Sequence, residues 1–132
     1  MYEPPRAKAK SVRGGAPVAF EVAAAQSLPF ADATFDVVLC SLALHHVPED
    51  ARAGALTEMR RVLKPGGRAL IVEFSRGHGA GAALNPMALL HARRNPRMLD
   101  ETAALMKGTG FERLVTGALG FGGMGYVLAR RD

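Results

Sequence analysis

Two adjacent histidines and one carboxylate are the side chains in this sequence best suited to moving protons. His45 and His46 follow one apolar run, and Glu73 lies near the end of another. Histidine changes charge between about pH 5 and 8, so it can take or release a proton in a pocket. Adjacent histidines point in different directions, so no metal site is expected. We interpret His45, His46 and Glu73 either as substrate-pocket residues or as groups that hydrogen-bond at strand ends, and no residue is assigned as catalytic.

The sequence holds one cysteine, Cys40, which excludes an internal disulfide and a multi-cysteine metal site. Cys40 lies in an apolar run, so we expect it in the core, and a reducing, cytoplasmic location is the default expectation. Asp36 precedes the same run. It is either a structural hydrogen-bond acceptor or a base, and the first role is favoured.

A glycine pattern after Glu73 could cradle a phosphate or nucleotide. Gly77, Gly79 and Gly81 form a Gly-x-Gly-x-Gly sequence. A lone pattern of this kind is a weak signal. Its distance from Glu73 is long, and Pro86 interrupts the helix that should follow it. We therefore expect a flexible loop over the substrate side.

The charge distribution argues against nucleic acid as a partner. The net charge is +5, and residues 1–15 carry four basic residues against one acidic residue. Tryptophan is absent and the other aromatic residues are few, so no stacking surface accompanies the basic residues. We expect residues 1–15 to be a flexible basic lead-in. No apolar stretch approaches the ~20 residues of a membrane-spanning helix, so no membrane contact is expected.

The elements around the histidines follow a strand–helix–strand order. Val18, Phe20 and Val22 alternate with other residues and predict a short strand. The apolar run within 36–42 predicts a strand buried on both faces, as in parallel sheets. A helix follows from Pro48 to Lys64, with an apolar stripe at Ala55, Leu56, Met59, Val62 and Leu63. Pro65-Gly66-Gly67 ends this helix, and a strand over 69–74 completes a parallel βαβ unit.

The carboxyl-terminal part predicts two further helices and a hairpin. A short helix is expected from Met87 to Arg94 and a second from Met98 to Met106, before Gly108 and Gly110. Strands over 114–116 and 126–129 are joined without room for a crossover helix, so they should be antiparallel.

Two segments together carry a resemblance to a known family. Residues 25–38 read AQSLPFADATFDVV, and residues 44–47 and 58–67 read LHHV and EMRRVLKPGG. In this order and spacing they resemble the class I S-adenosylmethionine-dependent methyltransferases, in particular the type 11 branch that includes quinone-biosynthesis C-methyltransferases. The resemblance covers about residues 16–131. We expect residues 16–132 to form one partial methyltransferase domain.

The resemblance implies an α/β fold with a Rossmann-like, mostly parallel sheet that ends in an antiparallel hairpin, the last strand lying between two others. It implies S-adenosylmethionine as cofactor and a small molecule as methyl acceptor. The backbone N–H of Ala25 would donate to the adenine ring, and Ser41 would lie beside the methionine part. Ala24 occupies the position where the family often has an aspartate that contacts the adenine amino group.

The family's first two strands, with their acidic residues and glycine turn, have no counterpart in residues 1–15, because a βαβ unit needs roughly 30 residues. Two readings follow. The chain is either a methyltransferase domain, or a truncated or degenerate relative without catalysis that self-associates through an exposed sheet edge or needs a partner chain.

Overall fold

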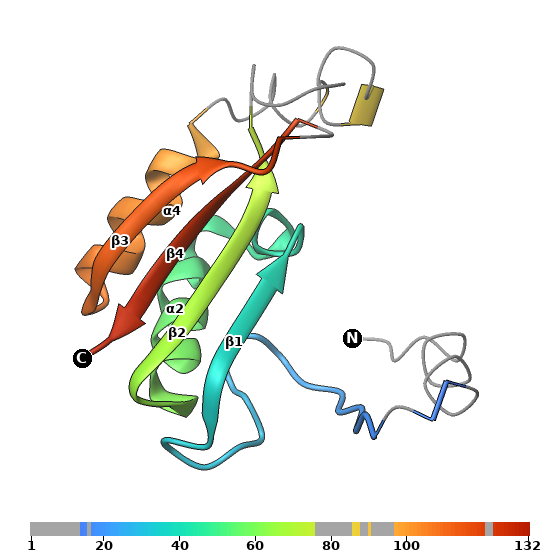
Figure 1. The fold of residues 1–132 in the computed structure, drawn as a ribbon, viewed down its shortest axis with the longest axis vertical. Helices are drawn as coiled ribbons and strands as arrows, with labels where there is room; N and C mark the ends of the chain where they lie inside the picture. The colour runs from blue at the N-terminus through green and yellow to red at the C-terminus, as the bar shows by residue number, and fades with distance from the viewer. Residues whose placement is uncertain (1–13, 16, 76–85, 88–89, 91–96, 121–122) are drawn as a thin grey trace.

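The protein is described by a computed structural model that covers residues 14–15, 17–75, 86–87, 90, 97–120 and 123–132. Its elements run β1 (Phe35–Ser41), the 3-10 turn η1 (Leu44–His46), α2 (Glu49–Val62), β2 (Leu63–Phe74), α4 (Met98–Gly108), β3 (Phe111–Ala118) and β4 (Met124–Arg131). Both helices lie on the same face of the sheet (Figure 1). No helix among these residues is long and apolar enough to span a membrane.

The four strands form one sheet in the order β1-β2-β4-β3. Strands β1 and β2 are parallel, with Val37 opposite Arg68 and Ser41 opposite Val72. This confirms the expected parallel pairing of segments 36–42 and 69–74. The expectation that 36–42 is buried on both faces is wrong, because Val37 and Leu39 of this edge strand are exposed. Strand β4 is antiparallel to both β2 and β3, which confirms the hairpin and the position of the last strand between two others. The prediction of a mostly parallel sheet is wrong here, because β4 makes two of the three strand pairs antiparallel.

Helix α2 forms where the apolar period predicted it, with small differences at its ends. Pro48 is the N-cap, and Glu49 and Asp50 lie in the first turn, where carboxylates favour the helix dipole. Ala55, Leu56, Met59 and Val62 are its buried residues. The helix ends at Val62, whereas the sequence predicted that it would continue to Lys64. Leu63 begins β2 instead, because it pairs with Phe35.

Strand β2 includes the glycine pair that was expected to separate helix and strand. Its pairing with β1 is irregular between Phe35 and Val37, and becomes regular from Arg68 onward. Gly66 has a φ of 79°, which favours glycine. At Gly67 a Cβ atom would lie 2.8 Å from the carbonyl oxygen of Lys64. This stretch therefore needs glycine for a tight change of direction between α2 and the regular part of β2.

The short strand expected around Val18, Phe20 and Val22 does not form. Residues 17–23 have no strand assignment, and Val18 and Val22 are 54% and 55% exposed. An alternating pattern becomes a strand only when its backbone groups find a partner strand. The described residues provide no such partner for this segment.

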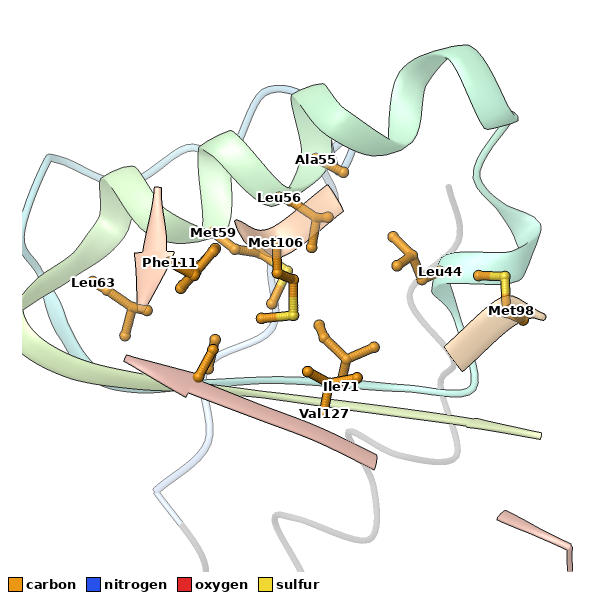
Figure 2. Close-up of a cluster of buried hydrophobic side chains, with 12 residues drawn as sticks. Leu44, Ala55, Leu56, Met59, Leu63, Ile71, Met98, Met106, Phe111 and Val127 are labelled. Atoms are coloured by element: carbon orange, nitrogen blue, oxygen red, sulfur yellow. The ribbon is translucent and has the colours of Figure 1, made fainter. Parts of the chain in front are cut away.

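The core lies between the helices and the sheet, and Figure 2 shows its labelled side chains. Leu56 of α2, Met106 of α4 and Ile71 of β2 are each fully buried there. Cys40 packs against this cluster, as predicted, although it is only partly buried. The predicted glycine motif at 77–81 and most of the helix predicted from Met87 to Arg94 lie outside the described residues, as does most of the lead-in.

Candidate functional site

The candidate site lies where the carboxyl ends of β1 and β2 meet. Ser41 is the last residue of β1, and Glu73 is one residue before the end of β2. Between them in the chain, η1 carries His45 and His46. Leu42 connects β1 to this turn with a φ of 53°, and its N–H donates to the carbonyl of Val72. Ligands of open α/β sheets commonly bind beyond the carboxyl ends of the strands.

His45 and Glu73 are in direct side-chain contact in this region. Glu73 Oε2 lies 2.7 Å from His45 Nδ1, and Glu73 Oε1 accepts the backbone N–H of His45 at 3.2 Å. The Glu73 side chain is 1% exposed and that of His45 is 14% exposed. A buried carboxylate needs such partners, because burial without them is costly. Two of the three residues that the sequence singled out for proton transfer, His45 and Glu73, are thus in direct contact.

Arg52 of α2 holds the second half of η1 and the residue that follows it. Arg52 of α2 donates through Nε to the carbonyl of Val47 at 3.0 Å and through a terminal nitrogen to that of His45 at 3.4 Å. The His45 and His46 ring centroids are 4.1 Å apart.

Burial, and then the nearby charge of Glu73, raises the pKa of the Cys40 thiol above its ordinary value.

A pocket of about 380 Å³ lies beside the turn. It is lined by two short stretches of chain, residues 22–26 and residues 46–48. Its size falls in the range of roughly 300–1,000 Å³ that is usual for small-molecule sites. Three predicted site residues, Ala24, Ala25 and His46, line it together, whereas Ser41, His45 and Glu73 do not.

Helix α2 holds segment 28–32, which follows the pocket-lining residues 22–26. Sequence analysis did not identify this contact. Arg61 donates to the carbonyl of Phe30 at 2.8 Å and to that of Leu28 at 3.1 Å. Its guanidinium also contacts Asp32 at 2.7 Å and Glu58 at 2.7 Å. Glu58 Oε2 in turn accepts the Leu28 N–H at 2.8 Å. We call Glu58 and Arg61 the α2 clamp.

The sequence indicated the pairing of Glu58 with Arg61 within α2, but not their contacts with segment 28–32. Glu58 and Arg61 are three positions apart, a spacing at which side chains of one helix can pair on its surface, and they form such a pair here. Nothing local to α2 indicated that the same groups bind segment 28–32. The Arg61 hydrogen bond, and then the Leu28 N–H, lower the pKa of Glu58 to about 2. The hydrogen bond to Glu58 also raises the pKa of Arg61.

Asp36 is a weaker structural acceptor than the sequence suggested. Its carboxylate lies 3.5 Å from Lys64 Nζ, and its side chain is 83% exposed. Exposed pairs of this kind contribute little to stability. Its position at the start of β1 places it at the opposite end of the strand from Ser41 and η1.

The profile of a methyltransferase domain matches residues 2–71 of this chain. Among curated proteins, a ubiquinone/menaquinone biosynthesis C-methyltransferase of Geobacter sulfurreducens is 47% identical over 58 residues. That match covers 44% of this chain and 22% of the relative. The chain thus spans less than a third of the length of the curated relatives that it matches.

Solved structures match nearly the whole chain. A protein of Pyrococcus horikoshii has a TM-score of 0.74 at 17% identity, with 96% of this chain and 68% of that chain covered. A SAM-dependent methyltransferase of Thermotoga maritima, described as a possible histamine N-methyltransferase, has a TM-score of 0.66 at 19% identity. That match covers 97% of this chain and 70% of the other. At these identities the likeness shows the fold, a Rossmann-like α/β sheet.

Proposed function

Because this chain belongs to the methyltransferase domain family of class I S-adenosylmethionine-dependent enzymes, we propose that it takes part in methyl transfer from S-adenosylmethionine to a small molecule. The curated relatives are named ubiquinone/menaquinone biosynthesis C-methyltransferases, and this name supports a small-molecule acceptor. A cytoplasmic location fits the bacterial relatives and stays a prediction.

The pocket beside η1 is the observation that carries this proposal, because its lining fits the adenosine part of the cofactor. The lining residues Ala23, Ala24 and Ala25 are small and apolar, and they leave room for a planar purine ring. The backbone N–H of Ala25 makes no hydrogen bond within the described part of the chain, and it can donate to a ring nitrogen. The Ala25 methyl packs against the core. Ser41, at the end of β1, is proposed to lie toward the methionine part.

Positioning is the main task of the protein in such a reaction. S-adenosylmethionine supplies a methyl group on a positively charged sulfur, and transfer needs the acceptor held in line with it. The α2 clamp serves this task because it fixes segment 28–32, directly after the pocket lining, with several charge-assisted hydrogen bonds. His46 lines the pocket and is proposed as a contact for cofactor or acceptor.

Calorimetric titration with S-adenosylhomocysteine tests the proposal. The full chain should bind it with a saturable signal. Ala24→Asp should strengthen binding by up to about tenfold, because an added carboxylate can accept a hydrogen bond from the adenine amino group worth roughly 0.5–1.5 kcal/mol. Gln26→Asp is the matched control, since Gln26 lines the same pocket and the charge change is the same. No binding by the parent chain would refute the function for this chain.

A second role is supported by the exposed strand β1. Val37 and Leu39 are 52% and 60% exposed on this edge strand. The other edge, β3, is interrupted between Glu112 and Val115, and Arg113 there has a φ of 50°. Irregular edges resist pairing with other chains, whereas apolar edges with a continuous register, as β1 has from Val37 to Ser41, favour it. We propose that β1 pairs with a strand of a second copy or of a partner chain.

A further inference from the structure

The sheet has one face that neither α2 nor α4 covers, and we call it the open face. Both helices lie behind the sheet in Figure 1, so the open face is turned toward the viewer. Side chains along a strand alternate between the two faces of a sheet. Ala69 and Ile71 of β2 belong to the core between sheet and helices. Their neighbours Arg68, Leu70 and Val72 therefore point to the open face.

An apolar row crosses the open face from one edge of the sheet to the other. Leu39, Leu70, Leu128 and Val115 lie opposite one another in successive strands. The residues at the two ends, Leu39 and Val115, are 60% and 52% exposed. A continuous exposed apolar row is typical of an interaction surface.

Two arginines lie side by side in the adjacent row of the same face. Arg68 of β2 is directly opposite Arg130 of β4, and both are exposed. Like charges that face each other across two strands are unfavourable. Glu112 lies opposite Arg130 on β3, yet no ion pair joins either arginine to a carboxylate within the described part of the chain. The open face thus combines an apolar surface with two unpaired cations.

These charges select the occupant of the open face. A second copy would bring the same two arginines and a net charge of +5. The longer stretches of this chain outside the described residues are also basic. Residues 1–13 hold four basic residues and one acidic residue, and residues 76–96 hold three basic residues and no acidic residue. Because opposite charges favour association and like charges oppose it, an acidic partner fits this face best.

We propose that the open face binds an amphipathic helix of an acidic partner chain, whose apolar side covers the leucines of the row and whose carboxylates pair with Arg68 and Arg130. Adjacent rows on one face are about 6.6 Å apart along a strand. Four residues of a helix advance about 6 Å. A helix that runs along β2 and β4 therefore places its carboxylates over the arginines when they lie one turn beyond its apolar residues. Pairing at the β1 edge leaves this face uncovered, so the two interactions are independent.

Two synthetic helical peptides test the charge of the partner. Both carry a stripe of leucines, and the turn beyond the stripe holds glutamates in one peptide and lysines in the other. Binding of each peptide to the full chain is measured by fluorescence anisotropy. The parent should bind the glutamate peptide about tenfold more tightly, because two exposed ion pairs replace two repulsive contacts. Equal affinities, or no binding of either peptide, would overturn the proposal.

Arg68→Glu tests whether the arginines cause this preference. The substitution turns the like-charged pair into a favourable cross-strand pair with Arg130, so the variant should fold at least as well as the parent. Its preference for the glutamate peptide should disappear. Lys107→Glu is the matched control, since Lys107 is exposed on α4, away from the open face, and the charge change is the same. A preference that both variants keep, or that both lose, would overturn the proposal.

Leu70→Thr tests the apolar part of the surface. Threonine suits a strand but removes apolar surface, so both peptides should bind more weakly by a similar factor. Parent-strength binding by this variant would show that the peptides bind elsewhere and would overturn the proposal. A peptide affinity that falls as the protein concentration rises would assign the open face to a second copy, which also overturns it.

Discussion

At the scale of single residues, Arg61 connects two segments that are far apart in the chain. Its guanidinium binds the carbonyls of Leu28 and Phe30, which are 33 and 31 positions away, together with the carboxylate of Asp32. Glu58 completes the arrangement by accepting the Leu28 N–H. Arginine suits this role because its planar group offers several donors in fixed directions, which lysine lacks.

The α2 clamp predicts a specific loss of stability in acid. The pKa of Glu58 is lowered from 4.5 to about 2, chiefly by Arg61. A carboxyl group with a lowered folded-state pKa stabilises the folded state above its unfolded pKa, and this stabilisation is lost as pH falls through the folded pKa. The stability difference between the parent and Glu58→Gln should therefore shrink as pH falls from about 4.5 to about 2.

Urea unfolding followed over this pH range measures the difference. Glu21→Gln is the control, because Glu21 is an exposed carboxylate outside the clamp. Its difference from the parent should stay small throughout. A Glu58→Gln difference that does not vary with pH would show that the Arg61 contact is not maintained in solution.

At the scale of elements, α2 contributes both to the core and to the site. One face buries Ala55, Leu56 and Met59 against the sheet, while Glu58 and Arg61 hold segment 28–32. The apolar period predicted the buried face well, because that pattern is local to the helix. The end of the helix was predicted less well, since Leu63 joins β2 through a contact with Phe35, on another strand.

Leu56→Ala should destabilise the protein by about 2–5 kcal/mol, because it removes a large side chain from a fully buried position and leaves a cavity. Thr57→Ala is the matched control on the same helix, since Thr57 is exposed. Its effect should be within about 0.5 kcal/mol, as for other surface changes. The measurement is the free energy of unfolding in urea. Equal effects of the two substitutions would contradict the assigned core face of α2.

At the scale of the whole molecule, the two faces of the sheet differ. One face packs against α2 and α4 (Figure 1). On the other face, one row of apolar side chains crosses all four strands, with Leu39 opposite Leu70, Leu70 opposite Leu128, and Leu128 opposite Val115. The residues at the two ends of this row, Leu39 and Val115, are 60% and 52% exposed. Exposed apolar surface on an edge strand favours association.

Association through β1 predicts that Leu39→Lys disrupts self-assembly. The parent chain should elute as a dimer or larger species in size-exclusion chromatography with light scattering, and Leu39→Lys should shift it toward monomer, because lysine on an edge strand opposes pairing. Val115→Lys is the matched control at the other end of the same row, on the interrupted edge β3. A monomeric parent, or equal effects of both substitutions, would contradict pairing through β1.

The sequence by itself determined the family, the helix α2, the parallel pair β1 and β2, and the carboxyl-terminal hairpin. Each of these follows from a local pattern of apolar residues or from motifs whose order is preserved. Only the tertiary structure decided that His45 meets Glu73, that Arg61 holds segment 28–32, and that 17–23 is not a strand. The physical reason is the same in each case. Buried polar groups and strand edges depend on their partners, and these partners lie tens of residues away, as with the 28 positions between His45 and Glu73.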